Sequence, residues 1–154
     1  GARMTKKILK GLKYDNKTIE DIALLVEQHL RPHTFKMGWT DSAVRRYIVD
    51  AGHMLEDLNE LVRADVTTKN KIKAKEIYEN LDEMEKRIEE VKAKEELSKI
   101  RPALSGDEIM EHFNIQPGPK VGVIMKALYE QRINDGEVSK EDALKLAEET
   151  YKNL

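Results

Sequence analysis

The chain has 154 residues, of which 36% are charged and 5% are aromatic, and its formal net charge at pH 7 is −2. This composition favours helices with long charged faces over a sandwich or a barrel, and the absence of cysteine excludes a disulfide framework and a thiolate metal site. No apolar run approaches the length needed to cross a bilayer and no signal-peptide pattern opens the chain, so we expect a cytoplasmic protein that binds no membrane.

The first quarter of the chain predicts two helices. A helix over residues 1–13 would carry one apolar face, made of Met4, Ile8, Leu9 and Leu12. After a turn with Asp15 as N-cap, apolar residues at a period near 3.6 predict a second helix through Arg31, where Pro32 ends it. Residues 34–39 are expected to form a loop.

Three further helices are predicted in the middle of the chain. The first is capped by Thr40 and ends at Gly52, and the second ends near Asp65. From Thr67 the pattern lengthens into one helix that reaches about Leu97. Its apolar stripe is predicted to pack against neighbouring helices, with a coiled-coil seam as the alternative. The stripe consists of Ile77, Leu81, Met84, Ile88 and Val91.

The last third predicts a helix, a tight turn and a helix, followed by a final helix capped by Ser139. Ser105 and Glu108 form a capping box at the start of this segment. Pro119 suits the first turn of the next helix, whose bare N-terminus beside Lys120 could hold an anion such as a phosphate. A plain turn between packed helices is the alternative. Because no segment alternates like a strand, we predict an all-α, multi-helix array.

Two basic segments stand out in a chain that is not basic as a whole. One lies over residues 3–13 and the other over residues 69–75. Any contact with nucleic acid must therefore come from local patches, although a basic run is also common on a merely solvated face. The side chains of Thr68, Lys69 and Asn70 can all donate to phosphate oxygens.

Four sequence blocks occur together in this chain. They are G-W-T-D-S-A-V-R-R-Y-I-V-D-A-G (38–52), L-V-R-A-D-V-T-T-K-N (61–70), E-E-L-S-K-I-R-P (95–102), and S-G-D-E-I-M with I-Q-P-G-P-K-V-G (105–122). In this order they resemble the C-terminal portion of bacterial tRNA nucleotidyltransferases, the CCA-adding enzyme and poly(A) polymerase family. The likeness covers nearly the whole chain and is greatest to the actinobacterial branch.

The resemblance implies a division into three parts. Residues 1–66 would be the C-terminal part of an HD-type helical domain, residues 67–101 a long connecting helix, and residues 102–154 a helical tail that binds tRNA. In the family, Mg²⁺ and the substrates CTP and ATP are held by an N-terminal head built on a β-sheet. This chain lacks that head, so we expect it to bind no cofactor and to be inactive alone.

The resemblance also implies that this chain holds tRNA along the acceptor stem and T-arm. A-form RNA is read mainly through its backbone, 2′-hydroxyls and shape, which suits cationic side chains and helix N-termini. The candidate RNA contacts are Arg45, Arg46, Lys69, Asn70, Gly118, Lys120 and Gly122. For the two arginines, internal salt bridges are the alternative.

A metal site is the least complete of the predictions. By resemblance to HD-type domains, Asp65 matches the last metal ligand and His29 an earlier one. Two such ligands cannot close a site, so this chain would carry half of it. Packing of His29 against its neighbours, and an N-cap role for Asp65 or Thr67, are the alternatives.

Two other functions remain open at this stage: an HD-type phosphohydrolase remnant and a coiled-coil interaction module. The chain opens with Gly1, so either G-A-R is left from cloning or the chain begins inside a larger protein, which the resemblance favours. A chain cut from a larger one would expose apolar surface, and we therefore expect that it can self-associate.

Overall fold

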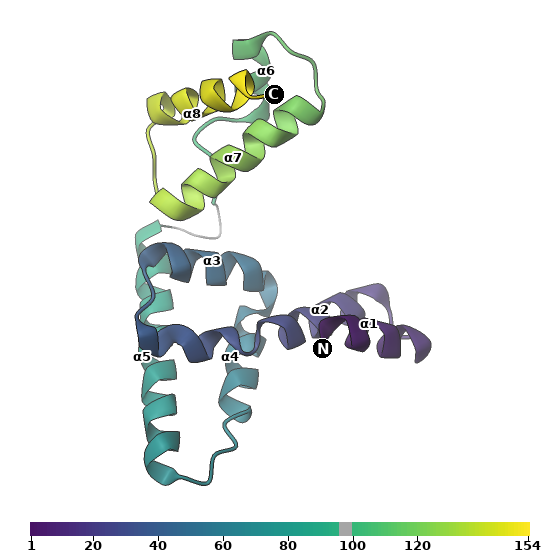
Figure 1. The fold of residues 1–154 in the computed structure, drawn as a ribbon, viewed down its shortest axis with the longest axis vertical. Helices are drawn as coiled ribbons and strands as arrows, with labels where there is room; N and C mark the ends of the chain where they lie inside the picture. Colours follow the sequence, from purple (N-terminus) through teal and green to yellow (C-terminus); the bar gives the residue numbers. More distant parts are fainter. Residues whose placement is uncertain (96–99) are drawn as a thin grey trace. The chain divides into compact units, whose positions relative to one another are not determined.

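The computed structural model describes residues 1–95 and 100–154. In these two ranges it contains eight α-helices and two short 3-10 helices, and no strand (Figure 1). The predicted all-α fold is confirmed. Helices form because apolar residues recur at the helical period while charged residues fill the remaining faces.

The chain divides into two compact units. The first unit comprises residues 1–40 and 47–90, and the second comprises residues 41–46 and 91–154. The predicted three-part division, with boundaries after residues 66 and 101, stays a prediction.

The first unit begins with two helices that lie side by side, α1 (Ala2–Gly11) and α2 (Asn16–Gln28) (Figure 1). Asp15 is the N-cap of α2, as predicted, and its carboxylate accepts from the backbone N–H of Thr18 at 3.0 Å. The half-buried residues of α1 include Leu9, and its predicted apolar face remains largely open to solvent. The exposed fractions are 68% for Met4, 58% for Ile8 and 64% for Leu12.

The segment after α2 differs from the prediction. Helix α2 ends at Gln28, and a 3-10 helix η1 (Arg31–Met37) follows directly. The predicted helix through Arg31 therefore extends too far, and the predicted loop at 34–39 is wrong over residues 34–37, where η1 extends, and confirmed at residues 38–39. Pro32 lies near the start of η1, where its missing N–H costs nothing. Helix α3 (Asp41–Ala51) comes next and is followed by η2 (Gly52–Met54).

Helices α4 (Leu55–Ala64) and α5 (Lys71–Glu95) follow. The predicted start of the long helix at Thr67 is four residues early, and its predicted end near Leu97 lies outside the described residues. Four of the five residues of the stripe on α5 are buried within this chain, as predicted, and Ile77 is half-buried, so most of the seam that a coiled-coil module would need is already occupied. Its exposed fractions are 2% for Leu81, 0% for Met84, 2% for Ile88 and 1% for Val91.

Three helices make up most of the second unit: α6 (Gly106–Phe113), α7 (Pro119–Asp135) and α8 (Lys140–Lys152). The predicted caps are confirmed, because the capping box of Ser105 and Glu108 is complete and Ser139 caps α8. Helix α7 packs against both α6 and α8 around a shared apolar core. This core consists of Leu104, Ile109, Ile124, Leu128, Ala143 and Ala147.

Among the helices that the structure describes, none combines the length and the apolar character that a membrane crossing requires.

Candidate nucleic-acid interface

The N-terminus of α7 is an exposed helix end. Gly118 is its N-cap and has no side chain to cap the first turn, and Pro119 occupies the first helical position, as predicted. By their place in the first turn, the N–H groups of Lys120 and Val121 have no partner within the helix. Unpaired donors at the positive end of a helix dipole, beside an exposed lysine, form an arrangement that favours anions.

The two glycines leave room for a close approach to the α7 backbone. A Cβ atom added at Gly122 would meet no other atom within 4 Å, and one added at Gly118 would find only the carbonyl oxygen of Gln116, at 3.8 Å. Both glycines are exposed. Close packing requires neither glycine, but Gly118 also suits the N-cap of a plain turn, so the choice between an RNA contact and a plain turn stays open.

Lys120 is held near this helix end by α8. Its Nζ lies 5.4 Å from the centroid of the Tyr151 ring, a cation–π distance. The Tyr151 ring in turn stacks on Phe113 of α6 at 4.5 Å between centroids. The aromatic pair thus places the ammonium group beside the N-terminus of α7 while leaving it accessible.

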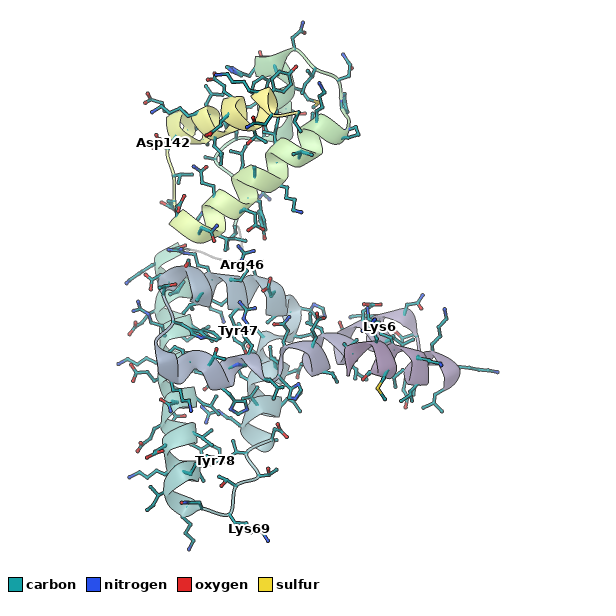
Figure 2. The ribbon with its side chains drawn as sticks, in the orientation of Figure 1. Lys6, Arg46, Tyr47, Lys69, Tyr78 and Asp142 are labelled. Carbon is teal, nitrogen blue, oxygen red and sulfur yellow. The ribbon has the colours of Figure 1, made fainter. Side chains whose placement is uncertain are left out.

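Lys69 lies in the loop before α5, and Figure 2 shows its side chain directed away from the helices. The neighbouring Asn70 has a structural task. Its Oδ1 accepts from the backbone N–H groups of Ile72 at 3.0 Å and Lys73 at 3.2 Å, so that Asn70 is the N-cap of α5. The alternative considered for Asp65 or Thr67, an N-cap role, is therefore wrong. RNA binding by Lys69 and Asn70 stays a prediction.

Arg45 is buried among internal partners. Its Nε donates to both carboxylate oxygens of Glu95 at 2.8 and 2.9 Å, and its Nη1 donates to the carbonyl of Ile133 at 2.9 Å and of Asn134 at 3.3 Å. Only 7% of the residue is exposed. The two carbonyls belong to the last turn of α7, where a cation is favoured by the helix dipole.

Arg46 is less enclosed and pairs with α7. Its Nη1 and Nη2 donate to the two carboxylate oxygens of Glu130 at 3.1 and 2.6 Å, a bidentate geometry. This pair lowers the pKa of the Glu130 carboxyl below its usual value, because the hydrogen bond from Arg46 favours the charged form. The geometry of both arginines is that of the internal salt bridges considered as the alternative, and their contact with RNA stays a prediction.

The predicted metal ligands have other surroundings. The Nδ1 of His29 donates to the carbonyl of Val26 at 2.7 Å. Asp65 is the exposed C-cap of α4. Across residues 1–95 and 100–154, no three histidine, aspartate or glutamate side chains lie close enough together to hold a metal ion. The half-site at His29 and Asp65, and the expectation that this chain binds no cofactor, stay predictions.

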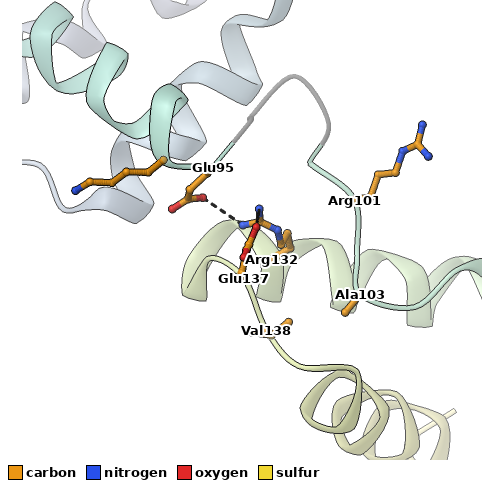
Figure 3. A pocket seen from close by; sticks show the side chains of 7 residues that line it. Glu95, Arg101, Ala103, Arg132, Glu137 and Val138 are labelled. Atoms are coloured by element: carbon orange, nitrogen blue, oxygen red, sulfur yellow. Dashed lines mark hydrogen bonds and ion pairs between the residues drawn. The ribbon is translucent and has the colours of Figure 1, made fainter.

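The sequence predictions did not include a basic pocket in the second unit (Figure 3). Its cationic residues are Lys94, Arg101 and Arg132. Arg101 lies within one of the four recognised blocks, but nothing in the spacing of these three residues indicates that they would line one pocket. Only the fold of the second unit brings them together.

Comparison with known proteins identifies the family. The family model tRNA nucleotidyltransferase domain 2 matches residues 2–147. The CC-adding tRNA nucleotidyltransferase of Thermus thermophilus is 32% identical over 143 residues, which cover 93% of this chain and 30% of that protein. The A-adding tRNA nucleotidyltransferase of Deinococcus radiodurans is 29% identical over 134 residues, which cover 86% of this chain and 30% of that protein.

The chain thus spans just under a third of the length of these relatives. No solved structure matches it with significance. The predicted likeness to the actinobacterial branch in particular stays a prediction. Because the family match extends over nearly all of its residues, the chain belongs to the tRNA nucleotidyltransferase domain 2 family.

Proposed function

We propose that this chain is the tRNA-binding portion of a tRNA nucleotidyltransferase, an enzyme that adds CCA, part of CCA or A residues to RNA 3′ ends. The observation that carries the proposal is the match to relatives named as CC-adding and A-adding tRNA nucleotidyltransferases over 93% and 86% of this chain. The nucleotidyl transfer itself would belong to the part of such an enzyme that this chain does not match.

The proposed work of this portion is to hold the acceptor stem and T-arm so that the RNA 3′ end is positioned for transfer. The exposed N-terminus of α7 would bind a backbone phosphate through its N–H groups and Lys120, with Gly118 and Gly122 admitting the RNA backbone closely. Lys69 would make a second phosphate contact from the first unit. Contacts of this kind read the shape of A-form RNA and need no base-specific side chains.

Mg²⁺, CTP and ATP enter the proposal only through the whole enzyme, which would work in the cytoplasm. When bound, Mg²⁺ would stabilise the negative charge on the nucleotide phosphates during transfer. The contribution of this chain is to bind and orient the RNA.

The proposal is tested by equilibrium binding to a folded tRNA and to a single-stranded RNA of equal length, over a series of salt concentrations. We expect tighter binding to the folded tRNA, weakening steeply with salt because counterions are released from the phosphates. The Lys69→Glu/Lys120→Glu variant should bind tRNA at least about tenfold more weakly. The matched control is Lys17→Glu/Lys36→Glu, which changes the net charge equally at two exposed lysines.

Equal weak binding to both RNAs by the unchanged chain would refute the proposed function. Unchanged affinity in the Lys69→Glu/Lys120→Glu variant would refute only the assignment of these two contacts. Gly122→Ala gives an independent measure, since alanine should stabilise the helix by up to about 1 kcal/mol. A more stable variant with weaker tRNA binding would show that the RNA approaches the backbone at this position.

A further inference from the structure

A pocket of about 510 Å³ lies within the second unit (Figure 3). Its walls come from the end of α5, the segment before α6, the last turns of α7 and the segment before α8. The lining residues are Lys94, Glu95, Arg101, Ala103, Arg132, Glu137 and Val138.

Glu95 does not cancel the positive charge of this pocket, because two arginines share its carboxylate. Arg45 donates to both of its oxygens, and the Nη1 of Arg132 donates to its Oε2 at 3.2 Å. One negative charge therefore faces two positive charges. All three side chains are largely buried, so solvent screens the remaining charge only in part.

Arg132 has more donors than acceptors among the residues that the structure describes. A guanidinium group carries five N–H bonds, and within the described residues the side chain of Arg132 makes one hydrogen bond, to Glu95. Its Nη2 lies 4.0 Å from a carboxylate oxygen of Glu137, beyond hydrogen-bonding distance. Only 7% of Arg132 is exposed, so an acceptor that enters the pocket would satisfy donors that solvent reaches poorly.

Lys94 and Arg101 add two accessible cations. Both are exposed, and neither has a hydrogen-bond or ion-pair partner among residues 1–95 and 100–154. Glu137 is the one lining carboxylate that accepts no hydrogen bond from the residues described, and its side chain is 81% exposed. With Arg45 included, the described residues place four cations against two carboxylates, an excess of two positive charges among them.

We propose that this pocket binds phosphate groups of an RNA backbone, as a contact additional to Lys69 and the N-terminus of α7. Arginine and lysine donors around a polar cavity suit phosphate oxygens. The described lining contains no aromatic ring on which a base could stack, so the backbone is the part of RNA that fits. The choice of RNA over a free phosphate compound rests on the proposed function.

The test uses Lys94→Gln/Arg101→Gln, which removes two exposed charges and leaves the buried arginines in place. Folded tRNA should bind this variant about tenfold more weakly, and the slope of log affinity against log salt should fall by about one to two, as expected for two lost phosphate contacts. Lys17→Gln/Lys36→Gln, with the same loss of exposed charge, should bind like the unchanged chain. Denaturant unfolding of each variant checks that the fold is retained.

Glu137→Gln changes the charge of the pocket in the opposite direction, because it removes a negative charge. Removing the competing carboxylate should tighten tRNA binding by about two- to fivefold, the range expected for one exposed charge. Weaker binding by this variant would contradict an anion pocket.

A direct measurement separates this proposal from the proposed function. The NMR signals of the Nε–Hε groups of Arg101 and Arg132 are followed during titration with folded tRNA and, separately, with inorganic phosphate. Movement of both signals with tRNA supports the proposal. Normal tRNA binding by Lys94→Gln/Arg101→Gln, with neither signal moving, overturns the pocket and leaves the function intact. If the unchanged chain binds no tRNA, both fail, and a response to inorganic phosphate would then identify a free phosphate compound as the occupant.

Discussion

Arg45 and Arg46 are adjacent in the sequence and look alike there, but their surroundings differ. The partners of Arg45 are Glu95, Ile133 and Asn134, between 50 and 89 residues away along the chain. Sequence spacing carries no information about such distant contacts. From the sequence alone, an arginine in a basic pair is equally consistent with an RNA contact and with an internal ion pair. Only the fold shows which of the two arginines is buried and which is partly exposed.

This difference predicts unequal costs of substitution. Arg45→Met leaves two α7 carbonyls without their side-chain donor and Glu95 with one cation, so we expect a loss of about 3 kcal/mol or more in the free energy of unfolding. Arg46→Met breaks a partly exposed pair with Glu130 and should cost about 1 kcal/mol or less. Urea unfolding of both variants measures the two costs, and equal costs would contradict the internal role of Arg45.

The lowered pKa of Glu108 predicts that the stability of the fold depends on pH. Lys140 donates to its Oε1 at 2.6 Å and the backbone N–H of Ser105 donates to its Oε2 at 2.8 Å, which lowers its pKa from 4.5 to about 2. A lowered pKa in the folded state stabilises the fold above pH 4.5. This contribution is lost as the pH falls from about 4.5 to about 2.

The matching variant is Glu108→Gln, because glutamine can keep the capping box while losing the charge. The melting temperature of the unchanged chain should exceed that of Glu108→Gln near neutral pH, and the gap should close between about pH 4.5 and pH 2. Glu111→Gln on the same helix, which removes an exposed carboxylate that has no ion-pair partner in the described residues, is the control. A gap that stays constant with pH would argue against the Lys140 pair.

At the scale of whole elements, the sequence predicts helix boundaries best where a capping side chain close in sequence determines them. Asp15, Ser105 and Ser139 cap helices as expected, because a side chain three residues before an unpaired N–H is a short-range signal. Prediction failed between Gln28 and Gly38, where a 3-10 helix replaces both the expected helix end and most of the expected loop. The start of α5 was also misplaced, since Thr67, Thr68 and Asn70 are all capable caps and the local pattern does not choose among them.

Asn70 allows the capping role to be separated from RNA binding. Asn70→Ala removes the acceptor for two N–H groups at the start of α5, so it should destabilise the fold by about 1 kcal/mol. Lys69→Ala changes a neighbouring side chain that points to solvent and should leave stability within about 0.5 kcal/mol of the unchanged chain. Denaturant unfolding gives both values. Full stability of Asn70→Ala would exclude the cap.

In the molecule as a whole, the local cationic groups suit RNA as a partner, whereas the exposed apolar surface suits a second copy of the chain. The net charge of −2 excludes a uniformly basic surface, so the RNA contacts proposed for α7 and the loop before α5 depend on local arrangement. The sequence could indicate these exposed positions because turn glycines and lysines are visible in it, and their contact with RNA stays a prediction. It could not predict the pocket of Lys94, Arg101 and Arg132, which only the fold of the second unit assembles.

The exposed apolar surface proposed for self-association lies on helix α1. One stripe of the helix, which includes Leu9, is half-buried beside α2, while the adjoining stripe of Met4, Ile8 and Leu12 stays more than half exposed. We therefore expect the chain to self-associate through this stripe as its concentration rises, with two copies covering each other's exposed side chains. Sedimentation analysis over a range of concentrations would detect this as a rising average mass.

Ile8→Gln/Leu12→Gln should keep the chain monomeric over that concentration range. Its stability should change by no more than about 0.5 kcal/mol, because neither side chain is buried in the free chain. Ile72→Gln, which removes a side chain on α5 that is 74% exposed, should associate like the unchanged chain. Association that persists in the α1 variant but disappears in Ile72→Gln would move the self-association surface to α5. A mass independent of concentration in the unchanged chain would show that the open face of α1 does not hold two copies together.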